Sequence, residues 1–303
     1  MIVERLYMEQ ASIERRAAER SEEEKMIVDA QVHLWKAEAP DRPWPAWGRE
    51  ACHLAEPLTY PKMLGLMDEA GVDRVVIVPP SWEGDRIDYA LEAAEKYPDR
   101  FAVMGRIALD DPREAKRLEH WRDQKGMLGI RLTFSYGKES WISDGTADWF
   151  WPVVEEAEIP VMVHPPHFIP LIAEVAAKYP RLKIVIDHFG ISRQIARSGT
   201  IAENIAQTVT LARYPNVHVK TTSAPTYSSE AYPFRDMYSH IRRVVEAFGP
   251  RRCFWGTDLS ISFDKCSYRQ RVTHFTEELD FLSAEDKEWI MGRGILECLR
   301  WPA

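Results

Sequence analysis

Short apolar runs alternate along the chain with longer segments whose apolar residues recur at helical spacing. The short runs, predicted as strands, cover residues 26–33, 73–79, 101–108, 127–133, 159–164, 183–188, 216–221 and 252–257. The segments predicted as helices cover residues 60–70, 86–97, 112–125, 148–156, 168–179, 191–213 and 230–248. This alternation favours right-handed crossovers and a parallel sheet. Eight strands predict an α/β fold closed as a (β/α)8 TIM barrel.

An open, doubly wound sheet is the alternative architecture. It is less favoured because no glycine-rich phosphate-binding turn follows the first predicted strand. Two long segments also interrupt the alternation, at 35–57 with its tryptophans and prolines and at 222–233 with Pro225 and Tyr227. We expect both to be loops over the mouth of the barrel. The other interpretation is that their aromatic residues pack against the outside.

Residues 1–25 have a different character from the rest of the chain. They combine interleaved charges with many helix formers and no glycine or proline, which predicts a charged helical extension. Leu6, Tyr7 and Ile13 would then be available to contact a second subunit in a homo-oligomer, and a solvated extension is the alternative. Residues 26–303 are predicted to form the barrel domain.

Composition narrows the class of protein. The formal net charge of −8 comes without a basic stripe, which argues against nucleic acid as a partner. No apolar run is long enough to span a bilayer, and no signal-like segment opens the chain. The four cysteines lack CxxC spacing, so free thiols in a reducing cytoplasm are expected. A cytoplasmic enzyme with a small-molecule substrate fits these features.

Polar residues stand where the predicted strands end. They are Gln31 and His33 on the first strand, Arg131 on the fourth, and His164, His188, Lys220 and Asp258 at the ends of the fifth to eighth. In a parallel barrel the active site forms at the carboxyl ends of the strands. Neutral imidazole and carboxylate oxygen are also ligands that Zn²⁺ and similar ions prefer. The pattern therefore predicts an active site and is compatible with a metal ion there.

Side chains alternate between the two faces of a strand, so sequence parity predicts their direction. Asp29, Gln31 and His33 are predicted to point into the barrel, and the apolar residues between them toward the helices. By the same rule His188 points inward and Asp187 points toward the helices.

Several motifs resemble a known family. They are the Asp29-x-Gln31-x-His33 opening, His164 after the fifth strand, Asp187-His188 after the sixth, and Thr257-Asp258 after the eighth. Together they resemble the amidohydrolase superfamily, and more closely its "amidohydrolase 2" branch. That branch includes lactone hydrolases and metal-dependent nonoxidative decarboxylases. The resemblance extends from about Met26 to the C-terminus.

The resemblance implies roles for individual residues. Gln31, His33, His164 and Asp258 would hold one divalent ion, zinc or manganese, with Asp258 also the general base. His188 would orient water or polarise the substrate. Gln31 departs from the His or Glu usual at its position, and an amide oxygen is a weaker ligand for such ions. The metal is therefore either held by the other three residues or not used.

We expect a hydrolase that opens a lactone of a small carboxylated substrate, with Asp258 taking a proton from water. Arg131 can bind the acid group through its guanidinium, or instead form an ion pair across the barrel. Lys220, Trp35 and Tyr227 are expected to complete the substrate-binding wall. One alternative is a metal-dependent nonoxidative decarboxylase of an aromatic or enol acid. Another is a catalytically silent binding module that has lost its metal site.

Overall fold

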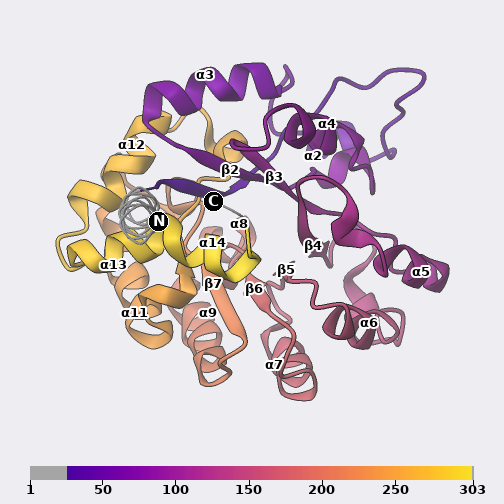
Figure 1. The fold of residues 1–303 in the computed structure, drawn as a ribbon. Helices are drawn as coiled ribbons and strands as arrows, with labels where there is room; N and C mark the ends of the chain where they lie inside the picture. Colours follow the sequence, from indigo (N-terminus) through magenta and orange to yellow (C-terminus); the bar gives the residue numbers. More distant parts are fainter. Residues whose placement is uncertain (1–25, 302–303) are drawn as a thin grey trace, which may run out of the picture.

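Eight parallel strands succeed one another around the barrel in the order in which they occur in the sequence (Figure 1). The computed structural model describes residues 26–301. The strands are β1 (Val28–Val32), β2 (Arg74–Ile77), β3 (Phe101–Gly105), β4 (Met127–Thr133), β5 (Val161–His164), β6 (Ile184–Ile186), β7 (Val217–Lys220) and β8 (Cys253–Phe254). The Ala30 amide donates to the Trp255 carbonyl at 3.1 Å and the Asp258 amide to that of Gln31 at 2.9 Å, which joins the last strand region to the first. The predicted barrel is confirmed, and the predicted extension at 1–25 lies outside the described residues.

Helices surround the strands in the predicted order. They are α2 (Gly48–Ala51), α3 (Tyr60–Ala70), α4 (Asp88–Lys96), α5 (Ala115–Leu118), α6 (Phe150–Glu156), α7 (Ile169–Lys178), α8 (Arg193–Arg197), α9 (Ile201–Thr208), α10 (Ala224–Tyr227), α11 (Tyr238–Phe248), α12 (Tyr268–Thr273), α13 (Ala284–Glu288) and α14 (Gly294–Leu299). The segment 191–213, predicted as one helix, is divided between α8 and α9. Gly199 lies between them with a φ of +74°, outside the helical region. Helices α12 to α14 were not predicted.

Two apolar clusters fill the structure, and in several strands neighbouring residues belong to different clusters. Val161 and Val163 of β5 pack outward under the helices, whereas Met162 between them packs inside the barrel. Helix α14 joins the inner cluster and lies across one end of the barrel (Figure 1). Its Cys298 carbonyl accepts a hydrogen bond from Lys183, the residue just before β6, at 3.0 Å. The amino end of the barrel is therefore closed by an apolar helix.

The first strand departs from simple alternation. Asp29 faces helix α12, where it accepts a hydrogen bond from the Tyr268 hydroxyl at 2.9 Å, and its apolar neighbours pack inside the barrel. The pairing of β1 with β2 shifts register between Asp29 and Val32. Such an irregularity resets the alternation of side chains. The predicted inward direction is correct for Gln31 and His33 and wrong for Asp29. The predicted outward direction is wrong for Val28 and Ala30, which pack inside the barrel.

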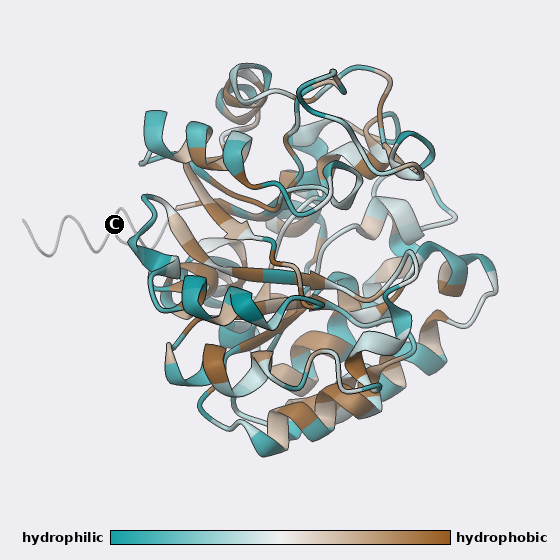
Figure 2. Ribbon diagram, turned by 90° about the vertical axis from the view of Figure 1, so that its right-hand side faces the viewer, coloured by the Kyte–Doolittle hydropathy of each residue, from teal (hydrophilic) through white to brown (hydrophobic). Residues whose placement is uncertain are grey.

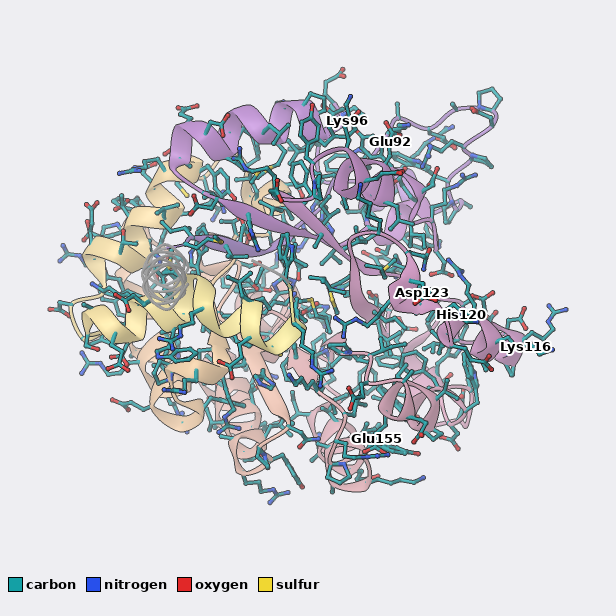
Figure 3. All side chains as sticks on the ribbon, viewed as in Figure 1. Glu92, Lys96, Lys116, His120, Asp123 and Glu155 are labelled. Atoms are coloured by element: carbon teal, nitrogen blue, oxygen red, sulfur yellow. The ribbon has the colours of Figure 1, made fainter. Side chains whose placement is uncertain are left out.

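Polar side chains cover the exterior. Brown, apolar segments gather in the strands and on the inner faces of helices in Figure 2, and teal segments lie mainly outside. Lys116, His120 and Asp123, beside helix α5, point away from the barrel (Figure 3). Within residues 26–301 no helix combines the length and apolar character needed to cross a membrane. All four cysteines are free.

Candidate active site

A cavity of about 590 Å³ opens at the carboxyl end of the barrel. Six residues predicted from the sequence line it: His33, Arg131, His164, His188, Tyr227 and Asp258. They come from strand ends and loops that are far apart in the chain, and the parallel barrel brings them together. Gln31 lies against this group through a contact with His188.

The backbone is strained at three polar residues that follow the last strands. His188, Ser223 and Asp258 come shortly after β6, β7 and β8 and have φ values of 52°, 66° and 48°. Residues with a side chain rarely adopt this left-handed region, and such conformations cluster at active sites. These residues also touch one another, because Nδ1 of His188 lies 3.0 Å from Oγ of Ser223, which donates to Oδ2 of Asp258 at 3.2 Å.

Asp258 is a buried carboxylate with one oxygen unsatisfied. Its Oδ1 lies 3.2 Å from Nε2 of His33 and has no hydrogen-bond partner among residues 26–301, and its Oδ2 lies 3.6 Å from Nε2 of His188. Burial raises the pKa of this carboxyl, but the facing His33 and the neighbouring His188 outweigh burial and hold the pKa well below its usual value. The carboxylate therefore stays ionised at neutral pH.

The tautomer of His33 is set by its other ring nitrogen. Nδ1 lies 2.7 Å from the carbonyl oxygen of Val78, which can only accept, so Nδ1 carries a proton. In the neutral ring, Nε2 then presents a lone pair to the unsatisfied Oδ1 of Asp258. Two facing acceptors need a hydrogen or a cation between them. The separation of 3.2 Å has room for a hydrogen but not for a water oxygen, so a water molecule that donates to Asp258 would lie beside the pair, in the cavity that both residues line.

His188 is held neutral with its proton on Nδ1. Lys220 has only donors and is bonded to Oε1 of Gln31, so the Gln31 amide nitrogen faces Nε2 of His188 at 3.1 Å. That contact makes Nε2 an acceptor and leaves Nδ1 to donate to the hydroxyls of Thr222 at 2.5 Å and Ser223 at 3.0 Å. Burial lowers the pKa of His188 to about 3. The ring therefore positions its neighbours and does not present an N–H from Nε2 to a substrate carbonyl.

A fully buried ionic network lies beneath these imidazoles. Nζ of Lys220 lies 2.6 Å from Oδ1 of Asp187, and Nε of Arg131 donates to Oδ2 of Asp187 at 3.0 Å. Burial raises the pKa of Asp187, but Lys220 and then Arg131 outweigh it and hold the pKa below its usual value. Asp187 thus faces inward, which corrects the prediction that it faces the helices. Strand β6 ends at Ile186, and the left-handed backbone at His188 ends the alternation on which that prediction depended.

Two residues predicted to bind substrate do not reach the cavity. Trp35 is fully buried and packs edge-on against Trp82 with their ring centroids 5.2 Å apart. Lys220 is also fully buried, and its ammonium group contacts Asp187, Gln31 and the sulfur of Met162. Neither lines the cavity, because Lys220 is held by its buried ionic contacts and Trp35, which follows the end of β1, packs in the apolar cluster under the helices.

The predicted metal ligands are brought near one another but are largely engaged. Nε2 of His164 donates to the Ile191 carbonyl at 3.0 Å, and both ends of the Gln31 amide are occupied. Throughout residues 26–301, no three side chains of His, Cys, Asp or Glu are grouped so as to hold a metal ion. Within the predicted set, Nε2 of His33 and Oδ1 of Asp258 face each other, and Oδ1 accepts no hydrogen bond from residues 26–301. The donor set therefore does not fit the predicted four-ligand ion, because the Lys220 ammonium occupies the oxygen of Gln31.

Sequence reasoning missed other residues that line the cavity, among them His53 and Arg193. His53 comes from the predicted mouth loop 35–57, and its Nδ1 lies 2.8 Å from Oγ of Ser260. Burial lowers the pKa of His53 to about 4. Arg193 begins helix α8, five residues after His188, and its side chain is exposed at the rim. A histidine in a mouth loop was a usable indication, whereas parity says nothing about a residue such as Arg193 beyond the strand.

Known proteins share this sequence pattern. The chain is 31% identical over 252 residues to an L-fucono-1,5-lactonase of Burkholderia ambifaria, a match that covers 78% of this chain and 80% of that protein. It is 28% identical over 206 residues to a 4-sulfomuconolactone hydrolase of Hydrogenophaga intermedia, covering 66% of this chain and 64% of that protein.

Solved structures share the fold. An amidohydrolase from Burkholderia multivorans with bound zinc superposes with a TM-score of 0.76 at 21% identity, over 91% of this chain and all of that one. A 5-carboxyvanillate decarboxylase from Novosphingobium aromaticivorans, complexed with manganese, gives a TM-score of 0.67 at 16% identity over 92% and 97%. The amidohydrolase family profile matches residues 28–295, almost the whole described barrel. With this match and the 31% identity to a lactonase, the chain belongs to the amidohydrolase family of hydrolases.

Proposed function

We propose that this enzyme opens a lactone ring by attack of water activated by Asp258. The observation that carries the proposal is the unsatisfied Oδ1 of Asp258, which faces the lone pair of His33 at 3.2 Å. A water molecule in the cavity beside Oδ1 would donate one hydrogen to Asp258 and be aligned for attack. The similarity to two lactone hydrolases supports the same reaction class.

The proton moves through Asp258. The carboxylate takes a proton as the water oxygen bonds to the lactone carbonyl carbon, and it returns that proton to the ring oxygen as the carbon–oxygen bond of the ring breaks. Water and lactone are thereby converted into a hydroxy acid with no other reactant. Ser223 and the neutral His188 keep the carboxylate in place through the contacts described above.

Two guanidinium groups line the cavity at different depths. Arg131 is buried and lies close to His164. Burial and then the charge of Arg131 lower the pKa of His164 to about 4. A cation at this depth is suited to stabilise negative charge on the attacked carbonyl oxygen. Arg193 is exposed at the rim and is suited to pair with an acid group of the substrate. This assignment transfers the acid-binding role expected of Arg131 to Arg193.

The proposed reaction uses no metal ion. Oε1 of Gln31 is bonded to Lys220, and no group of three ligating side chains is present among residues 26–301. The decarboxylase alternative requires an ion that chelates the substrate, and no contact in the site specifically favours it.

Assays of hydroxy-acid formation on a panel of sugar lactones and unsaturated lactones, with CO₂ measured in parallel on aromatic acids, test the proposal. We expect lactone opening without CO₂ release, at a rate that EDTA leaves within about twofold. CO₂ release without lactone opening would reject the proposal. Loss of lactone opening in EDTA, with recovery on adding zinc or manganese, would reject the metal-free step.

A further inference from the structure

A second cavity of about 390 Å³ lies directly beside the first. Arg193, Tyr227 and Ile261 line both cavities, so these three side chains form the wall between them. A molecule whose reacting ring occupies the first cavity can therefore extend past Arg193 into the second.

The second cavity carries an excess of positive charge. Arg193, Arg197 and Lys265 line it, and Asp264 is the one acidic residue among its lining. Arg193 and Arg197 are four residues apart on α8, which places both on the same face of the helix. None of the three cations forms an ion pair with another residue between 26 and 301.

Some arginines elsewhere on the surface do have acidic partners. Arg113 and Arg117 are bonded to Asp111 and Glu114 at 2.7 Å and 3.0 Å. Two arginines and a lysine left without acidic partners around one cavity are an arrangement suited to an anion from outside the chain.

A hydroxyl group of a residue in the same wall also lacks a partner within the described part of the chain. Oγ1 of Thr226 is buried without a hydrogen bond to any residue from 26 to 301, although Thr226 lines the second cavity. The neighbouring Ser228 is by contrast occupied, since its hydroxyl is bonded to Asp236. A buried hydroxyl without a partner is costly unless a ligand or water satisfies it.

We propose that the second cavity is an anion-binding subsite for the distal end of the substrate. The substrate class is then a lactone with a carboxylate or phosphate several bonds from the ring, so that ring opening yields a product with two acidic groups. This inference rests on the proposed lactone hydrolysis for the identity of the ring, but the subsite itself can be tested by binding alone.

Calorimetric titration with three acids of the same carbon chain tests the subsite. Gluconate has no distal acid, glucarate has a distal carboxylate, and 6-phosphogluconate has a distal phosphate. We expect at least one distal anion to bind about tenfold more tightly than gluconate, as charge-assisted hydrogen bonds of this kind allow. The comparison of glucarate with 6-phosphogluconate identifies which anion the subsite prefers.

Substitutions in the second cavity should remove that advantage. Arg197 and Lys265 line the second cavity and not the first. Arg197→Gln and Lys265→Gln should each weaken binding of the distal anion severalfold while changing gluconate binding less than twofold. Arg243→Gln, an exposed residue of α11 outside both cavities, makes the same charge change and should have no effect.

Equal affinity for all three acids, or an advantage that survives both substitutions, would overturn the subsite. If no lactone is hydrolysed but the preference for a distal anion still depends on Arg197, the proposed reaction is rejected and the subsite is retained. If lactones are hydrolysed but no distal anion is preferred, the subsite is rejected and the reaction is retained.

Discussion

The two ends of the barrel bury different kinds of side chain. At the amino end, α14 closes the lumen with apolar side chains such as Leu299, which is fully buried in the same cluster as Phe254 and Met104. At the carboxyl end the buried positions are instead occupied by charges, with Lys220 and Asp187 both fully excluded from solvent. Apolar burial stabilises a fold directly, whereas a buried ion pair roughly offsets its own desolvation.

Stability and chemistry are therefore assigned to opposite ends of this fold. Strained backbone is found at His188, Ser223 and Asp258 beside the cavity, and the unsatisfied carboxylate oxygen lies there too. Such features cost free energy and persist only where the surrounding structure holds them. We infer that apolar burial at the amino end contributes free energy of folding, and that this contribution offsets the cost of the strained, preorganised site at the carboxyl end.

The largest expected effect is at Asp258. Asp258→Asn keeps the shape of the side chain but cannot accept a proton, so kcat for lactone opening should fall about 10³-fold with little change in the free energy of unfolding. Steady-state kinetics and urea unfolding measure the two quantities. Asp280→Asn, an exposed residue, is the matched control. Normal turnover in Asp258→Asn would remove this residue from the mechanism.

The next effect concerns the buried ions. Lys220→Met leaves Asp187 with Arg131 as its remaining ionic partner and leaves Oε1 of Gln31 unpaired, so the free energy of unfolding should fall by about 3–5 kcal/mol. Denaturant unfolding measures the loss. Lys116→Met, whose side chain points into solvent (Figure 3), should change stability by less than about 0.5 kcal/mol. Equal stability of the two variants would show that the network is energetically silent.

The amino end should respond in stability alone. Leu299→Ala creates a cavity in the inner cluster and should lower the free energy of unfolding by about 3 kcal/mol, with kcat within about twofold of the parent enzyme. Glu297 is exposed on the same helix, and Glu297→Ala should leave both the free energy of unfolding and kcat close to those of the parent enzyme. A large loss of kcat in the folded Leu299→Ala protein would contradict the division of roles between the two ends.

The smallest expected effect is a difference in acid sensitivity. Burial and then Arg131 lower the pKa of His164 from 6.5 to about 4, so between these values the unfolded chain binds more protons than the folded one. The free energy of unfolding should therefore decrease as pH falls through this window, by about 1–2 kcal/mol from this residue between pH 7 and pH 5. His164→Gln should reduce that decrease in unfolding experiments at both pH values.

Leu299→Ala is the control for this pH dependence, since it removes no titrating group. Its unfolding free energy should fall between pH 7 and pH 5 as steeply as that of the parent protein. An unchanged slope in His164→Gln would show that the acid sensitivity arises elsewhere.

The strand positions and most of the cavity residues could be predicted from sequence. All eight strands lie within their predicted ranges, and His33, His164, His188 and Asp258 line one cavity as expected. Helices α12 to α14 and the role of α14 were not predicted. Periodicity shows that a segment is amphipathic, but it does not say which end of a barrel that segment will cover.

The parallel barrel and the gathering of polar groups at its carboxyl end could be inferred from the sequence, because both follow from local periodicity and from the direction of the strands. The role of each polar group depends instead on tertiary contacts. A register shift in β1 turns Asp29 outward, and left-handed backbone after β6 allows both Asp187 and His188 to face inward. The pairing of Lys220 with Gln31 depends on contacts between residues far apart in the chain, which local patterns do not encode.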